Sequence, residues 1–243
     1  MYGAVLLDVY GTLVQDDDTK FTEAASQIAT LAGIDPGVVE REWSTRLRVM
    51  ADAAHGHAFR ALADLNLSSL TESAAHFGVR VDDAREIWRR QIEYWRPGPL
   101  FNDSLSFLAA VGVPVCLVSD TDRDSLAAVL DHRGVKVNNV VTSEDARAYK
   151  PRREPFEMAL RRLDVAASDV VHVGDSPGSD IVGASELGID TVFVSRDGRH
   201  LPPNLTATHS IETLTALLPI LSRLRAPAIS DDRRSGKPAP GGR

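Results

Sequence analysis

The sequence predicts an α/β protein with a doubly wound parallel sheet and one inserted helical unit. Two observations predict the sheet. Runs rich in Val, Ile and Leu recur after residue 100, and helical patterns of about 10 to 20 residues separate them. A third observation predicts the insert: about 80 residues that follow the first apolar run show only helical periodicity. The 243 residues are enough for a main domain and a smaller insert.

The first predicted strand is the apolar run of residues 4–7, which stops at Asp8. Gly11 follows shortly after, and glycine gives the backbone room to turn sharply. An aspartate at this position lies at the carboxyl edge of a strand, where open α/β sheets bind ligands. Asp8 is therefore the first candidate functional residue.

A helical insert is expected over residues 16–97. An apolar stripe at helical spacing begins at Phe21, and Asp35 followed by Pro36 is typical of a second helix start. Two more helical patterns follow before Pro, Gly and Pro at 97–99 return the chain to the sheet. We therefore predict four helices in the insert. The main domain is expected to comprise residues 1–15 and 98–222.

The remaining elements alternate between strand and helix. Strands are predicted at 113–118, 139–142, 170–173 and 191–194, and helices near 102–111, 123–133, 153–163 and 179–187. Continuous apolar strands of this kind imply a parallel sheet that is covered on both faces. Polar groups stand at later strand ends: Ser119, Lys150 before Pro151, and Gly174-Asp175-Ser176.

Composition limits the class of protein and its location. The single cysteine, Cys116, lies inside an apolar strand run, which excludes an internal disulfide. No apolar run approaches the roughly 20 residues that a membrane span needs. Met1 leads into the first strand rather than into a signal peptide. We expect a cytoplasmic protein with no membrane partner.

Charge is unevenly distributed along the chain. The 27 basic and 34 acidic residues give a formal net charge of −7. From Ser222 onward there are six basic and two acidic residues, so the tail carries +4 and the body about −11. An acidic body argues against nucleic acid as a partner. Residues 226–243, rich in Pro, Gly, Ser and Arg, are expected to be disordered.

The polar strand ends together resemble a known family. The stretches Asp8 to Leu13, Ser119, Lys150-Pro151, and Gly174-Asp175-Ser176 through Asp180 are similar, in order and spacing, to the four motifs of the haloacid dehalogenase (HAD) superfamily. The resemblance covers about residues 1 to 220 and implies a Rossmann-like core with a four-helix cap inserted after the first motif. This superfamily includes phosphatases, dehalogenases, phosphonatases and mutases on one scaffold, so the reaction and the substrate stay open.

The resemblance assigns catalytic roles to the strand-end residues. A carboxylate ionised at pH 7 can attack phosphorus or an sp³ carbon directly, so Asp8 is expected to form a covalent aspartyl intermediate. Thr12 would orient the turn or a substrate oxygen. Lys150 supplies a compact positive charge near the nucleophile and the phosphoryl group. Ser119 would donate its hydroxyl to the substrate anion, helped by the backbone amide of Asp120, whose own carboxylate departs from the usual neutral residue.

A metal site is predicted beside the nucleophile. Asp8 and Asp175 form a cluster of like charge that a cation would relieve, and such hard oxygen ligands suit Mg²⁺. In the phosphatases that the chain resembles, another protein ligand is the backbone carbonyl two residues after the nucleophile, here that of Tyr10. Asp180 is expected to be a further carboxylate close to the ion. The predicted cofactor is Mg²⁺.

Tyr10 departs from the phosphatase pattern, which usually has an aspartate there to protonate the leaving group. That general acid is worth roughly 10² to 10⁴-fold in rate, although Tyr10 could donate a weak phenolic proton. The 2-haloacid dehalogenases also have tyrosine at this position and use no metal, since halide needs no proton. Their fourth motif lacks the acidic pair that Gly174-Asp175 supplies here.

These observations favour a magnesium-dependent phosphatase acting on a small phosphorylated metabolite. A metal-independent 2-haloacid dehalogenase is the alternative, and a homologue that binds a phosphometabolite or a protein without turnover is another. A homodimer is left open. Specificity is expected in the cap, for which the candidates are Trp43, His57, Arg60 and Trp88. The cap arginine that haloacid dehalogenases use for the substrate carboxylate maps loosely onto Arg46 or Arg48.

Overall fold

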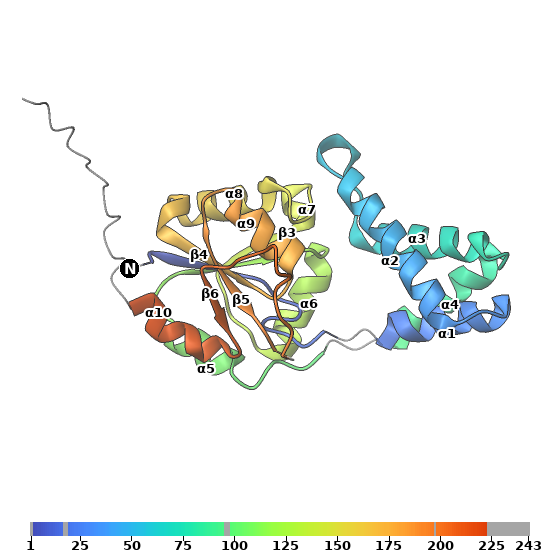
Figure 1. The fold of residues 1–243 in the computed structure, drawn as a ribbon, viewed down its shortest axis with the longest axis horizontal. Coiled ribbons are helices and arrows are strands. Elements are labelled where there is room, and N and C mark those ends of the chain that lie inside the picture. Colours follow the sequence, from blue (N-terminus) through green and yellow to red (C-terminus); the bar gives the residue numbers. More distant parts are fainter. Residues whose placement is uncertain (1, 17–18, 95–97, 197, 223–243) are drawn as a thin grey trace, which may run out of the picture.

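The computed structural model describes residues 2–16, 19–94, 98–196 and 198–222 (Figure 1). They contain a six-stranded, all-parallel sheet of order β3-β2-β1-β4-β5-β6, which confirms the predicted doubly wound α/β class. The strands are β1 (Ala4–Leu7), β2 (Val115–Ser119), β3 (Asn139–Thr142), β4 (Val170–Gly174), β5 (Asp190–Val194) and β6 (His209–Ile211). β6 was not predicted from the sequence, because three residues are too few for a recognisable apolar run.

Helices cover both faces of the sheet (Figure 1). One face packs against α8 (Arg153–Leu163) and α9 (Gly183–Ser185), next to the short α7 (Ser143–Ala146). The other packs against α5 (Ser104–Ala110), α6 (Arg123–Arg133), η4 (Leu214–Leu217) and α10 (Leu218–Ser222). Side chains of a strand alternate between faces, so Leu6 belongs to the first core and Val5 to the second. Burial on both faces explains the unbroken apolar runs.

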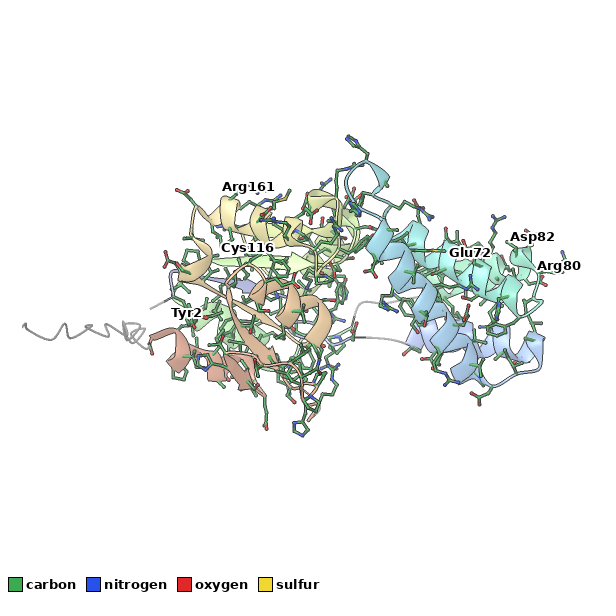
Figure 2. All side chains as sticks on the ribbon, turned by 45° about the horizontal axis from the view of Figure 1, so that its top comes forward. Tyr2, Glu72, Arg80, Asp82, Cys116 and Arg161 are labelled. Atoms are coloured by element: carbon green, nitrogen blue, oxygen red, sulfur yellow. The ribbon has the colours of Figure 1, made fainter. Side chains whose placement is uncertain are left out.

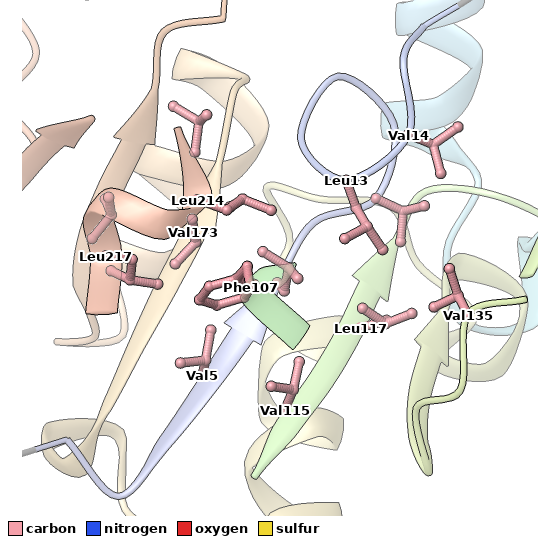
Figure 3. Packing of buried hydrophobic residues seen from close by; sticks show 14 of the residues in the cluster. Val5, Leu13, Val14, Phe107, Val115, Leu117, Val135, Val173, Leu214 and Leu217 are labelled. Atoms are coloured by element: carbon pink, nitrogen blue, oxygen red, sulfur yellow. The ribbon is translucent and has the colours of Figure 1, made fainter. Parts of the chain in front are cut away.

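Phe107 of α5 occupies the middle of the second core. It is fully buried, and Val5 and Val173 of neighbouring strands lie around it (Figure 3). Leu13 and Val14, from the loop after β1, belong to the same cluster. The loop that carries Asp8, Tyr10 and Thr12 is therefore held at both ends by the core.

Within its described residues, 19–94, the insert forms the four predicted helices, with a short 3₁₀ turn between the second and third. They are α1 (Thr19–Ala32), α2 (Pro36–Ala53), η1 (Gly56–Ala58), α3 (Leu62–His76) and α4 (Val81–Tyr94). Asp35 caps α2, since its Oδ1 accepts a 2.9 Å hydrogen bond from Gly37 N. In Figure 2 the residues Glu72, Arg80 and Asp82 lie in the part of the insert that is remote from the sheet.

The insert has an aromatic core of its own. The rings of Phe21, Trp43 and Trp88 lie with centroids 5.0 to 5.6 Å apart. Trp43 is only 3% exposed, and its Nε1 donates to Ser69 Oγ at 2.9 Å. The expectation that Trp43 reads the substrate is therefore wrong, because this side chain is used inside the helical unit.

Two predicted boundaries shift for local reasons. The second strand begins at Val115 rather than at 113. Pro114 has no N–H to donate, and the assigned strand begins at the residue after it. The predicted helix over 179–187 is instead a π-helical turn, Pro177–Val182, that leads into α9. Its wide geometry lets both Asp180 N and Ile181 N donate to Ser176 O, at 3.0 and 3.3 Å. Such turns frequently occur at functional sites.

Cys116 lies within the sheet (Figure 2) and is fully buried. Burial raises the pKa of its thiol to about 12, so the thiol is inert at neutral pH. In the described part of the chain, the helices are all too short or too polar to cross a bilayer. The predicted disordered tail, 226–243, lies outside the described residues.

Candidate active site

Asp8 and Asp175 lie side by side at the carboxyl edge of the sheet. They directly follow β1 and β4, which are neighbours at the centre of the strand order. Leu7 pairs with Val173, and Asp8 N donates to Val173 O at 2.9 Å, so the two strands end level. In sheets of this order, the strand connections change direction here and open the ligand-binding crevice.

Lys150 joins the nucleophile candidate to a third carboxylate. Its Nζ donates to Asp8 Oδ1 at 2.6 Å, to Asp180 Oδ1 at 2.7 Å and to Val118 O at 3.2 Å. Its side chain is only 3% exposed. Burial by itself would lower the pKa of Lys150, but the charges of Asp180 and Asp8 raise it above its ordinary value. The ammonium therefore stays charged at neutral pH.

Asp180 has hydrogen bonds to both of its oxygens. Besides Lys150, Oδ1 contacts Nε2 of His172 at 2.9 Å, and Oδ2 accepts from Ser176 N at 3.0 Å. Burial opposes its ionisation, but Lys150 and His172 outweigh burial and lower the pKa of Asp180. Asp180 is thus an ionised anchor that fixes Lys150 against the β4 loop.

His172 was missed from the sequence. It lies inside β4, where its signal was a lone polar residue in the run Val-Val-His-Val. The ring is fully buried, which lowers its pKa and keeps it neutral. Nε2–H then donates to Asp180, while Nδ1 has no hydrogen-bond partner among the described residues.

Arg199 is a second residue that sequence reasoning missed. Its NH2 donates to Asp175 Oδ2 at 2.9 Å from a loop behind β5. Burial and the charge of Asp180 raise the pKa of Asp175, and Arg199 partly offsets both. Asp8 has no such surface partner. Burial raises its pKa well above the ordinary value, Lys150 opposes this, and Asp180 and Asp175 raise it further.

The carboxylates fit a hard divalent cation. Asp8, Asp175 and Asp180 each place an oxygen within 4.8 Å of the others. Lys150 donates to Oδ1 of Asp8, and Arg199 donates to Oδ2 of Asp175. Clustered carboxylate oxygens are the hard ligands that Mg²⁺ prefers, and it usually binds through one or two carboxylates. The donor chemistry therefore suits the predicted cofactor.

Two glycines make room for these carboxylates. A Cβ at Gly11 would overlap the Asp175 carboxylate, and one at Gly174 would overlap that of Asp180. Gly11 also has φ of +80°, a backbone conformation that favours glycine. Side chains at these two positions would force the acidic cluster apart.

Three other predicted site residues lie at the same edge. Ser119 ends β2 and is 2% exposed. The Thr12 hydroxyl is buried with no hydrogen-bond partner in the described part of the chain, so a ligand oxygen could satisfy it. Asp120 Oδ1 accepts from Lys150 N at 2.9 Å, and burial raises its pKa to about 6. This bond turns the unusual carboxylate toward the Lys150 loop.

Tyr10 forms part of the wall of a large cleft. The cleft encloses about 1160 Å³ between core and insert, and Tyr10, Asp120, Phe21 and Trp88 contribute to its walls. Burial, followed by the charge of Asp16, raises the pKa of Tyr10 to about 12, so the phenol keeps its proton at neutral pH. Asp8 is not one of the residues that form the cleft wall.

The remaining cap candidates do not face this cleft. Arg46 pairs with Glu42 at 2.6 Å, and Arg48 lies 3.8 Å from Asp52 on the same helix. The loose mapping of a substrate-binding arginine onto either of them is therefore not supported. Arg60 donates to Ser68 Oγ at 2.6 Å. His57 also lies outside the cleft wall, which leaves Trp88 as the one specificity candidate that lines it.

Comparison with known families gives a match over most of the chain. A family profile described as haloacid dehalogenase-like hydrolase matches residues 2–188. The haloacid dehalogenase-like hydrolase domain-containing protein 3 of Danio rerio is 35% identical over 128 residues, which are 51% of this chain and 52% of that protein. The ribulose-1,5-bisphosphate 5-phosphatase of Halopiger xanaduensis is 30% identical over 56% of this chain and 61% of its own length. The chain thus spans about half to three fifths of these relatives.

A more distant relative matches over nearly the full length. The glyceraldehyde 3-phosphate phosphatase of Methanocaldococcus jannaschii is 24% identical over 93% of this chain and 99% of its own. Among solved structures, the L-2-haloacid dehalogenase of Xanthobacter autotrophicus has a TM-score of 0.69 at 17% identity and covers 91% of this chain and 98% of its own. A HAD phosphatase from Thermococcus onnurineus has a TM-score of 0.59 at 21% identity, covering 90% and 97%. The two structures support the fold.

Proposed function

The chain belongs to the haloacid dehalogenase-like hydrolases, and we propose that within this family it is a Mg²⁺-dependent phosphatase with Asp8 as the nucleophile. The observation that carries the proposal is the acidic cluster of Asp8, Asp175 and Asp180, whose oxygens lie within 4.8 Å of one another. Like charges at this distance oppose one another in a buried site, and a bound cation would relieve them. Metal-independent dehalogenation gives no reason for a second carboxylate beside the nucleophile.

Each residue of the site then has a defined task. A Mg²⁺ ion held by Asp8, Asp175 and the Tyr10 carbonyl would neutralise charge on the phosphoryl oxygens. Lys150 keeps Asp8 in place and adds a second positive charge. Asp8 attacks phosphorus, the bond from phosphorus to the leaving oxygen breaks, and an aspartyl phosphate forms. Water then attacks that phosphorus, which restores the Asp8 carboxylate and releases phosphate.

Tyr10 limits the leaving groups that this site can expel. A phenol with a pKa of about 12 can donate a hydrogen bond but is a poor proton donor to a departing alkoxide. Leaving groups that depart as stable anions need little protonation. We therefore propose that aryl phosphates, acyl phosphates or phosphoanhydrides react faster than simple alkyl phosphates.

Two further observations support a phosphatase. Two of the relatives described above are named as phosphatases, and the substrates in their names are those of the relatives themselves. The cleft beside Tyr10, at about 1160 Å³, is slightly larger than the roughly 300 to 1,000 Å³ of usual ligand sites and has room for far more than a small haloacid. A 2-haloacid dehalogenase remains the second candidate, because Tyr10 occupies the position that those enzymes also fill with tyrosine.

One assay separates the two reactions. Purified protein would be offered an aryl phosphate, an alkyl phosphate and 2-chloropropionate, each with Mg²⁺ and with EDTA, while released phosphate and chloride are measured. We expect phosphate release that requires Mg²⁺ and no chloride. The Asp8→Asn variant is the matched control for contaminating phosphatases. Chloride release that EDTA leaves unchanged would overturn the proposal.

A further inference from the structure

Asp122 stands at the N-cap position of α6 but does not cap that helix. Its Oδ1 accepts from Leu62 N at 2.7 Å and its Oδ2 from Ala63 N at 3.0 Å. These are the first two residues of α3, whose own N-cap residue, Ala61, has no side chain that could accept a hydrogen bond. The first amides of a helix lack partners within it and carry its positive dipole end. A carboxylate of the core therefore caps a helix of the insert.

The first amide of α6 has a partner outside its own helix. Arg123 N donates to Glu144 Oε2 at 2.8 Å, and the Arg123 guanidinium contacts Asp145 at 2.6 Å. Glu144 of α7 thus accepts from the first amide of α6, Arg123 N, which lies next to the N-cap residue Asp122. The Asp122 carboxylate bonds instead to the insert, through Leu62 N and Ala63 N.

A second set of contacts holds the same segment of the insert. Tyr149 OH donates to Arg60 O at 2.8 Å, and its ring stacks on Phe59 with centroids 5.5 Å apart. Arg147 Nε donates to Gly56 O at 2.8 Å, and Gly56 N donates to Arg147 O at 2.9 Å. Residues 56–63 of the insert are therefore docked on the core through several of their backbone groups and through the Phe59 ring.

The core residues of this contact are close in sequence to the anion-binding candidates. Asp122 follows Ser119 by three residues, and Tyr149 immediately precedes Lys150. Leu62 and Asp122 also form part of the cleft wall. A movement of the insert at this point would therefore pull on the loops that present Ser119 and Lys150.

We propose that Asp122 is a positioning residue that docks the helical cap on the core by capping α3. Its two oxygens hold the cap over the cleft, and the Tyr149 contact couples that docked state to the Lys150 loop. The effect on activity rests on the proposed function, whereas the docking itself can be measured without any substrate.

The test compares Asp122→Ala and Asp122→Asn with a control, Asp124→Asn, at an exposed acidic residue two positions after Asp122 in α6. Amide hydrogen exchange is measured over residues 59–66. We expect exchange in Asp122→Ala to be faster by roughly 3- to 30-fold, the range that loss of an N-cap implies. Asp122→Asn keeps one acceptor oxygen and should lie between, and Asp124→Asn should match wild type.

A distance measurement separates docking from a purely local cap. Spin labels are placed through Asp82→Cys on the insert and Arg161→Cys on α8, both exposed sites, since the buried Cys116 does not label. We expect Asp122→Ala to broaden the label-to-label distances. Unchanged exchange, or faster exchange with unchanged distances, would overturn the proposal. If the Ala variant unfolds, the Asn variant provides the same two readings.

An activity reading tests the coupling. On an aryl phosphate, Asp122→Ala should raise KM several-fold more than it lowers kcat, because the leaving group loses the docked cap. A rise in KM no larger than the fall in kcat, in variants with normal exchange and distances, would refute this coupling. If the protein is not a phosphatase, the exchange and distance results still decide whether Asp122 docks the cap.

Discussion

The Nζ of Lys150 donates a 2.6 Å hydrogen bond to Asp8 Oδ1, and both side chains are almost completely buried. The same ammonium contacts Asp180 at 2.7 Å. One positive charge thus compensates two carboxylates that are 172 residues apart in the chain. Because a buried ion pair that loses one partner leaves an uncompensated charge, this relationship governs stability as well as chemistry.

Replacing Lys150 should therefore destabilise the fold. We expect Lys150→Met to lower the free energy of unfolding by about 3 to 5 kcal/mol at pH 7. Urea denaturation followed by circular dichroism measures the change, and Lys136→Met, at an exposed position, is the matched control. A loss below about 1 kcal/mol, the size expected for a surface pair, would contradict this account of the buried network.

Asp8→Asn should abolish turnover and preserve the fold. The amide has nearly the shape of the carboxylate but is a poor nucleophile. We expect less than about a hundredth of the wild-type rate, which corresponds to about 3 kcal/mol of barrier. Mass spectrometry excludes deamidation back to aspartate. Appreciable activity in verified Asn protein would place the attacking group elsewhere.

Asp175→Ala should remove the response to Mg²⁺. In wild type, Mg²⁺ at 100 times its Kd should stabilise the fold by about 2.7 kcal/mol, or very roughly 5 to 10 °C in Tm. The variant should show neither this shift nor Mg²⁺ stimulation of activity, while Asp131→Asn on the exposed side of α6 keeps both. A wild-type shift in the Ala variant would reject Asp175 as a ligand.

Asp120 should make stability depend on pH. Its folded pKa of about 6 lies above the ordinary value of 3.8, so the folded state binds this proton more tightly. The resulting stabilisation is complete below about pH 4 and is lost as pH rises through 6. Asp120→Asn keeps an acceptor for Lys150 N without the buried charge. We expect its Tm, in EDTA, to exceed that of wild type by roughly 2 to 4 °C above pH 7.

The pH series from 4 to 8 provides the check on Asp120. The advantage of Asp120→Asn should shrink below pH 6 and vanish near pH 4. A constant difference across the series would mean that packing, rather than the Asp120 charge, causes it.

Tyr10→Asp distinguishes the two candidate reactions. A phosphatase limited by a poor general acid should gain more on alkyl than on aryl phosphates, by up to about 10²-fold. In a dehalogenase, the new carboxylate would repel the substrate carboxylate and the departing halide, so activity should fall. Tyr10→Phe removes only the hydroxyl and serves as the control. A folded Tyr10→Asp protein with an unchanged alkyl-to-aryl ratio would make Tyr10 a packing residue.

Much of the candidate site could be predicted from sequence, for a simple physical reason. In a sheet whose strands are all parallel, the residues that follow the strands meet at one edge. Asp8, Ser119 and Asp175 were recognisable because each directly follows an apolar run, and Lys150 because it precedes Pro151 in the family pattern. Helix starts such as the one at Asp35 could also be predicted, because an N-cap bonds to a residue only two or three positions later.

Tertiary structure alone decided which of these groups touch and which ordinary residues join them. Trp43 was considered from the sequence as a possible substrate contact, but its side chain packs inside the insert. Asp122 stands at the N-cap position of α6, yet its carboxylate bonds to the start of α3, 60 residues away. His172 and Arg199 acquire their roles only because strand order brings Asp180 and Asp175 to them. Periodicity reports which face of an element is buried. The partner on that face is set by strand order and domain docking, which bring together residues that are remote in the chain.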